Sequence, residues 1–168
     1  SVNVFSISII AADLNTIKNN LNLATAVSNS FLRVGATAAK DHVDRATAAT
    51  ATNTALTAGN GEHVPDTTSP SLVSFKIDMD SETITLTFSE TVDKDKLDAT
   101  KITLQNQPVA TIVKQLTGGT TSSSHGTVIV VQMIAADVLV LKATAGLVVD
   151  IDSSHIKLAA GVITDRNA

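Results

Sequence analysis

The chain has 168 residues, a formal net charge of -4 and no cysteine, and although 43% of its residues are hydrophobic, only 2% are aromatic. The lack of cysteine excludes disulfides and thiolate metal sites, and the scattered basic residues argue against nucleic acid binding. No apolar run approaches the roughly 18 residues that would cross a membrane, so no membrane span is expected.

The first elements expected along the chain are a short helix and two strands. Asp13 can cap the helix, whose apolar face begins at Leu14, and a strand pattern follows at 30–34. The segment 36–59 mixes Ala, which favours helix, with Thr, which favours strand, so its composition leaves both types open. Its position predicts that it carries a closing strand.

The stretch 64–71 is rich in turn-forming residues, holds two of the three prolines and is expected to be a linker. Short β-branched strand patterns follow at 72–78, 82–89, 100–105, 109–116 and 127–134. The polar tract 117–126 is predicted to be a loop or the end of a hairpin. A helix capped by Asp137 and a strand at about 154–158 complete the series, which is typical of an antiparallel sandwich with a short helical crossover.

The segments IIAADLNTIK at 9–18 and MIAADVLVLK at 133–142 are near copies of each other, 124 residues apart. Over the 44 residue pairs that this offset aligns, ten are identical. A period of this length corresponds to a whole domain. We therefore expect residues 1–63 to be the closing part of one repeat, 64–71 to be a linker, and 72–168 to be the opening and middle of the next repeat, whose closing strand lies outside the 168 residues.

The run DTTSPSLVSFKIDMDSETITLTFSETVD, followed by LDATKITLQ, resembles the bacterial-type immunoglobulin-like tandem repeats with an LTFSE signature. Such repeats occur in surface-layer proteins, adhesins and giant extracellular proteins of aquatic bacteria and algae. The resemblance covers nearly all of 64–168 and, in phase, 1–60. It implies an all-β, immunoglobulin-like antiparallel sandwich, a location that is extracellular or on the cell surface, and no catalytic residues.

Carboxylates recur in Asp-x-Asp pairs such as Asp78 and Asp80, and oxygen ligands of this kind bind calcium. The run after Asp78 fails the EF-hand pattern at Thr83 and Ser89. Asp66 is a further candidate, because a metal in the linker would stiffen a joint between repeats. Calcium at Asp66, Asp78 and Asp80 is the only cofactor that the sequence suggests. The alternative is that these carboxylates lie at solvated strand ends, where their charge discourages aggregation through exposed sheet edges.

Two patterns that resemble parts of catalytic or metal sites are incomplete. Ser154 and Lys157 match the S-x-x-K of serine acylases, but a strand would place them on opposite faces and the partner motifs are absent. The four histidines stand alone, without a second ligand at metal spacing; they are His42, His63, His125 and His155. No catalytic residue is expected, and the protein is not predicted to be an enzyme.

The predicted function is that of a structural repeat or subunit of an extracellular filament, stalk or surface layer that assembles head to tail. Its partners would be copies of itself or neighbouring repeats, and a strand from 36–58 of a neighbour could complete the second repeat by strand addition. The Thr- and Ser-rich loops could carry O-linked glycans or be plain polar loops; they lie at 47–57, 67–69 and 120–124.

The alternative function is an adhesin-type module that binds carbohydrate or protein through loops such as 117–126. The chain has no Trp and no Tyr. Sugar-binding platforms usually need these side chains, which present a flat apolar face and a polar edge. The composition therefore argues against a carbohydrate partner without removing a protein partner.

Overall fold

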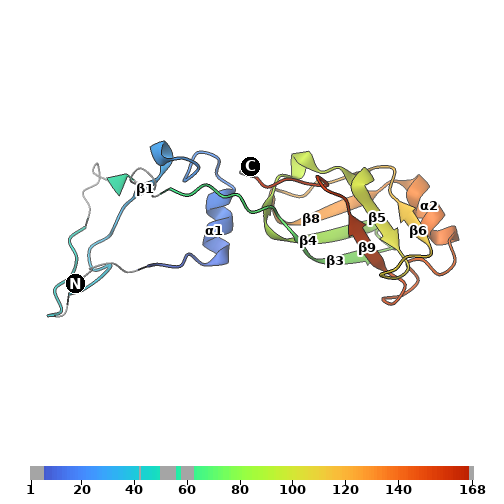
Figure 1. Cartoon of the computed structure of the whole chain (residues 1–168), viewed down its shortest axis with the longest axis horizontal. Helices are drawn as coiled ribbons and strands as arrows, with labels where there is room; N and C mark the ends of the chain where they lie inside the picture. The colour runs from blue at the N-terminus through green and yellow to red at the C-terminus, as the bar shows by residue number, and fades with distance from the viewer. Residues whose placement is uncertain (1–5, 42, 50–55, 58–62, 167–168) are drawn as a thin grey trace. The chain divides into compact units, whose positions relative to one another are not determined.

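A computed structural model describes residues 6–41, 43–49, 56–57 and 63–166 of the chain (Figure 1). The chain divides into two compact units, unit 1 over residues 1–67 and unit 2 over residues 68–166. The division falls inside the stretch 64–71 that the sequence predicts to be a linker. In the part of the chain that is described, no helix is both long enough and apolar enough to cross a membrane.

The described residues of unit 1 form a helix, a helical turn and a short strand pair. Helix α1 spans Ala11–Lys18 and the 3-10 turn η1 spans Val27–Asn29. Strand β1 (Phe31–Leu32) runs antiparallel to strand β2 (Leu56–Thr57), with Leu32 opposite Leu56. No residue whose burial is described in this unit is buried. Unit 1 therefore shows local structure without a core among its described residues.

Unit 2 contains two antiparallel sheets, with strand orders β3-β4-β8-β7 and β6-β5-β9. The strands are β3 (Leu72–Asp78), β4 (Thr83–Val92), β5 (Ile102–Gln105), β6 (Val113–Gln115), β7 (Gly119–Thr120), β8 (Gly126–Met133) and β9 (His155–Leu158). The 3-10 turns η2 (Lys94–Lys96) and η3 (Ala99–Lys101) lead into β5. These pairings confirm the prediction of a β-rich antiparallel fold.

Alternation along the strands builds the core of unit 2. In β4, Ile84, Leu86 and Phe88 are buried, while the threonines between them are only partly covered. Side chains from β8 and β5 enter the same cluster; they include Ile129, Val131, Ile102 and Leu104. Fully burying a side chain of this size contributes roughly 1.5–3 kcal/mol. The two sheets therefore pack around one shared core.

Helix α2 spans Ala135–Ala143 between β8 and β9, as the predicted helical crossover requires. The prediction that Asp137 caps this helix is wrong, because Ile134 occupies the N-cap position and Asp137 lies in the first turn. The buried Asp137 carboxylate instead accepts hydrogen bonds from the Thr117 backbone N–H at 2.7 Å and the Thr117 hydroxyl at 3.0 Å. Lys114 Nζ lies 2.7 Å from the same carboxylate. Asp137 thus ties α2 to β6, through Lys114, and to Thr117, which follows β6.

The internal repeat is also present in the local structure. The 124-residue offset relates the start of α1 to the start of α2 and the start of β1 to the start of β9. Ala24 and its equivalent Val148 both have a positive φ, of 56° and 57°. Asn29 and its equivalent Ser153 each use a side-chain oxygen to accept two backbone N–H groups from the preceding loop. The two segments therefore fold alike locally.

Candidate functional site

Strand β9 is the edge strand of the second sheet. On one side it pairs with β5, placing Ile156 opposite Leu104 and Leu158 opposite Ile102. On its other side no strand pairs with it among the described residues. An unpaired edge presents N–H and C=O groups that another strand can bind. In unit 1 the equivalent strand β1 pairs with β2.

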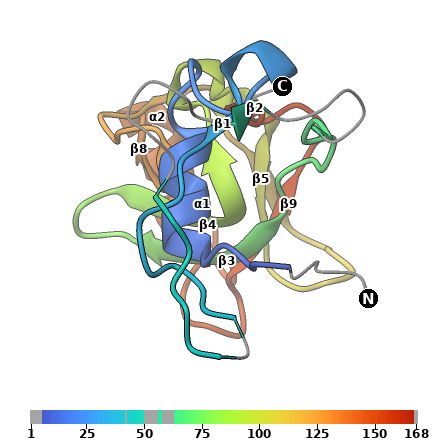
Figure 2. The ribbon, with the colours of Figure 1, turned by 90° about the vertical axis from the view of Figure 1, so that its left-hand side faces the viewer.

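An apolar groove of about 510 Å³ lies between β3 and the loop that leads into β9. Phe75, Ile77 and Met79 line it from one side, and Val148 and Ile151 line it from the loop. β3 and β9 are the edge strands of their sheets, and they lie close together in both views (Figure 1 and Figure 2). The open edge of β9 and the groove therefore belong to the same side of unit 2.

Apolar side chains in unit 1 are exposed where their repeat equivalents in unit 2 are buried. Four such residues are 38–79% exposed in unit 1, and their equivalents are only 0–3% exposed in unit 2. The pairs are Ile7 with Val131, Ile9 with Met133, Leu14 with Val138, and Leu23 with Leu147. Large apolar side chains left in solvent are stabilised when a second surface covers them. We call these four residues of unit 1 the exposed repeat face, because their equivalents in unit 2 face its core.

The outer face of the second sheet carries another groove, of about 690 Å³. Its lining mixes polar side chains, such as Lys101 and Gln105, with apolar ones, such as Pro108 and Val113. None of its lining residues is aromatic, so this groove lacks the stacking surface that a sugar platform uses.

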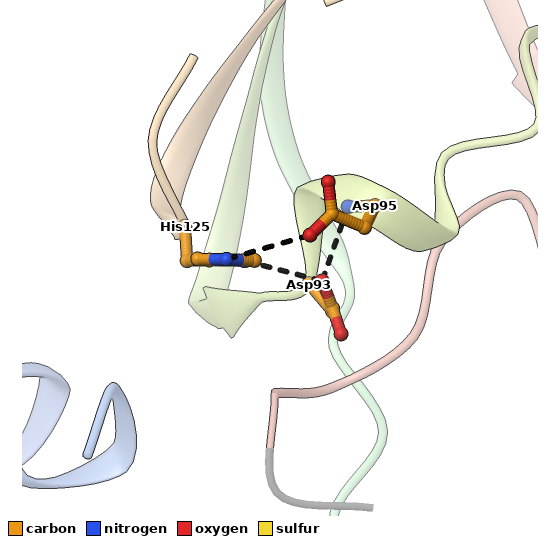
Figure 3. Close-up of side chains that lie close together, drawn as sticks. All are labelled: Asp93, Asp95 and His125. Carbon is orange, nitrogen blue, oxygen red and sulfur yellow. Dashed lines mark hydrogen bonds and ion pairs between the residues drawn. The ribbon is translucent and has the colours of Figure 1, made fainter. Parts of the chain in front are cut away.

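An acid–histidine cluster lies where β4 ends and β8 begins, and Figure 3 shows His125 against the carboxylates of Asp93 and Asp95. His125 Nδ1 is 3.1 Å from Asp93 Oδ1, and His125 Nε2 is 3.7 Å from Asp95 Oδ2. The prediction that His125 stands alone is therefore wrong. The pairing of Val92 with Gly126 brings the two segments together, so only knowledge of the β4–β8 register could have found the cluster.

Two cationic side chains already neutralise the two carboxylates of this cluster. Arg166 Nη1 lies 3.2 Å from Asp93 Oδ2. The Lys94 ammonium contacts Asp95, and this hydrogen bond lowers the pKa of the Asp95 carboxyl below its ordinary 3.8. The three ligand groups lie close enough to hold a metal ion, but a divalent ion would compete with both cations.

The cluster also fastens the C-terminal segment to the end of β4. The backbone N–H of Asp93 donates to the Thr164 carbonyl at 2.9 Å, and the N–H of Arg166 donates to the Thr91 carbonyl at 3.3 Å. In the described part of the chain no hydroxyl or thiol is bonded to His125. The cluster thus contains a histidine and an acid that could orient it, and its residues also join the C-terminal segment to the end of β4.

The predicted calcium ligands lie in two separate places. Asp66 is in unit 1, where it forms an ion pair with Lys18. Asp78 is at the end of β3, and one carboxylate oxygen accepts the N–H of Ser81 at 3.0 Å and of Asp80 at 3.1 Å. These hydrogen bonds lower the pKa of Asp78. Asp78 thus closes the β3–β4 turn, and calcium binding stays a prediction.

No family model matches the chain, and no curated protein or solved structure matches it either. The resemblance to LTFSE-type repeats therefore stays a prediction.

Proposed function

We propose that the chain is a structural repeat or subunit of an extracellular filament, stalk or surface layer that assembles head to tail through its open surfaces. One observation carries this proposal. The exposed repeat face of unit 1 leaves in solvent the side chains whose equivalents unit 2 buries in its core. A surface with the composition of a core is stable when another surface covers it.

The energetic reason lies in the size of these side chains. Burying one Val, Leu, Ile or Met contributes roughly 1.5–3 kcal/mol, so covering all four supplies a driving force of several kcal/mol. Ordering two partners in an assembly opposes this gain. The remaining contribution in this proposal comes from backbone hydrogen bonds at an open sheet edge, such as that of β9.

The arrangement of unit 2 supports the finer part of the proposal, an immunoglobulin-like sandwich. Seven strands in antiparallel sheets of four and three share one core, with a helical crossover before the last strand. The resemblance to tandem surface repeats supports an extracellular location. Copies of the chain, or neighbouring repeats, are the partners that this function needs.

Electron microscopy of negatively stained protein, together with light scattering after size exclusion, tests the proposal. We expect the wild-type chain to form filaments or elongated oligomers. The double variant Ile7→Asp/Ile9→Asp should remain monomeric, because it places charges on the exposed repeat face. Leu139→Asp is the matched control, since Leu139 is an exposed residue of α2 outside this face, and it should assemble like wild type.

Two results would overturn the proposal. One is a wild-type chain that stays monomeric at every concentration. The other is a double variant that assembles as well as the Leu139→Asp control.

A further inference from the structure

The segment before α1 has the residue pattern of a strand but has no strand partner among the described residues. Ser6 and Ser8 alternate with Ile7 and Ile9, and both isoleucines are exposed. By the 124-residue offset, residues 6–9 are equivalent to 130–133, which lie in β8. In β8 the equivalents of the two isoleucines are buried and the equivalents of the two serines are exposed. The repeat therefore indicates that residues 6–9 form a strand, with both isoleucines on its apolar face, when a sheet lies beside them.

Strand β3 offers an open edge next to the apolar groove of unit 2. It pairs with β4 on one side, and no described strand pairs with it on the other. Phe75 and Ile77 lie opposite buried residues of β4, so their side chains are on the core side of the sheet, and both line the groove. Across the groove lie Val149 and Ile151, two exposed residues of the loop between α2 and β9. β3 thus combines an unpaired edge with apolar walls that solvent reaches.

The loop that forms the far wall of the groove is held in place by its own hydrogen bonds. Ser153 Oγ accepts the backbone N–H groups of Val149 and Asp150, both at 3.0 Å. The backbone N–H of Ser153 donates to Asp150 Oδ1 at 2.9 Å. Ordering a loop opposes binding, and here the loop is ordered before a partner binds. The groove is therefore a preformed surface.

We propose that residues 6–10 of a second copy of the chain bind the open edge of β3 as an added strand, with Ile7 and Ile9 in the apolar groove. This inference rests on the proposed function, because it identifies the surface that covers two of the four residues of the exposed repeat face. It goes further by naming the strand that accepts them and the groove that receives their side chains.

The spacing of the side chains agrees with this arrangement. Alternate residues of a strand point to the same face, and strands paired in a sheet share their faces. Ile7 and Ile9 are two residues apart, as are Phe75 and Ile77 of β3. An added strand therefore brings both isoleucines to the groove together, and both serines to the outer face of the sheet.

The charges at this edge do not oppose the added strand. Charged side chains on an edge strand discourage the addition of another strand. Lys76 alternates with the groove-lining residues of β3 and so faces away from the groove, and its Nζ lies 3.5 Å from Asp78 Oδ2. Residues 6–10 carry no charge. The contact therefore buries no charge on the side of the incoming isoleucines.

A second copy is the occupant because the chain itself carries both matching surfaces. Residues 6–10 belong to unit 1, and β3 with its groove belongs to unit 2. Two different matching surfaces on one chain join copies in an open series rather than in a closed dimer. Each added copy then leaves one segment and one groove available, so the contact extends head to tail.

A charge placed in the groove of the full-length chain tests the acceptor surface. Ile151 is 87% exposed, so Ile151→Asp should leave unit 2 folded, as far-ultraviolet circular dichroism would check. Light scattering after size exclusion measures assembly. We expect Ile151→Asp to raise the concentration needed for assembly at least about tenfold, because the contact would bury an unpaired carboxylate. The matched control is Leu139→Asp, which replaces a 69% exposed leucine outside the groove and should shift that concentration by no more than about twofold.

Cysteine cross-linking tests the contact directly, and the absence of native cysteine gives a clean background. We would mix Ile7→Cys or Ile9→Cys with Ile151→Cys under mild oxidation, with an affinity tag on one of the two full-length chains. Mass spectrometry of the tagged dimer would identify the linked residues. The control mixtures contain Leu139→Cys in place of Ile151→Cys.

We expect at least one of the Ile151→Cys mixtures to give about tenfold more mixed dimer than its control, because a disulfide needs Cα atoms within about 7 Å. Yields equal to the controls, or assembly of Ile151→Asp equal to that of Leu139→Asp while Ile7→Asp/Ile9→Asp stays monomeric, would overturn the groove as acceptor and leave the proposed function intact. A disulfide within a monomer that carries both Ile9→Cys and Ile151→Cys would overturn the second copy as partner. A wild-type chain that never assembles would overturn both proposals.

Discussion

Removal of the Asp137 carboxylate tests whether one buried ion pair holds helix α2 onto the sheets of unit 2. In Asp137→Ala the Lys114 ammonium loses its partner, and the N–H and hydroxyl of Thr117 lose their acceptor. Asp137 is only 1% exposed and the Lys114 side chain 17% exposed, so water replaces little of what is lost. We therefore expect a large loss of stability from a residue that takes no part in the proposed assembly.

The magnitude follows from the geometry. Breaking a fully buried pair by removing one partner costs about 3–5 kcal/mol, and because Lys114 keeps some contact with water we expect about 3 kcal/mol. Domains of this size are stable by only about 5–15 kcal/mol. A loss of about 3 kcal/mol therefore lowers the melting temperature of unit 2 by more than about 10 °C.

Urea denaturation followed by far-ultraviolet circular dichroism measures this loss, since the chain has no Trp or Tyr for fluorescence. Asp13→Ala is the matched control, because Asp13 is the repeat equivalent of Asp137 but is exposed in α1. The control should change the free energy of unfolding by less than about 0.5 kcal/mol. A loss below about 1 kcal/mol in Asp137→Ala would refute the reasoning, because the ion pair would then contribute no more than an exposed one.

Two further expectations concern unit 2. Burial alone would raise the pKa of Asp137, but the Lys114 ammonium and the Thr117 donors outweigh it and lower that pKa below 3.8. The stabilisation is therefore complete above about pH 5 and is lost as the pH falls through the folded pKa. Acid titration of Asp137→Asn should accordingly show a shallower loss of stability than wild type. A methyl group at Gly119 would lie 3.0 Å from Ala99 Cβ, so Gly119→Ala should lower the free energy of unfolding by about 1 kcal/mol or more in urea denaturation. Gly118→Ala, whose methyl group would have nothing nearer than 3.7 Å, should leave the free energy of unfolding unchanged. Equal effects of the two substitutions would contradict this packing.

The strands were predictable because their signal is local. Alternation of apolar residues set the bounds 72–78 for β3 and came within one residue at each end of β8. β7 was missed, since its two residues, Gly119 and Thr120, lie in a polar tract and are held only by pairing with β8. The partners of Asp137 and His125 were missed for the same reason. They come from distant parts of the chain, and no spacing in the sequence encodes them.

The two copies of the AAD motif show what local sequence cannot decide. Asp13 and Asp137 occupy the same position of equivalent helices, yet one is exposed and the other is buried and ion-paired. The difference comes from Lys114 and Thr117, which have no repeat equivalent among the 168 residues. The same reasoning applies to the exposed repeat face. Ile7 and Ile9 lie in a segment without regular structure, whereas their equivalents Val131 and Met133 lie in β8, which is paired between β4 and β7.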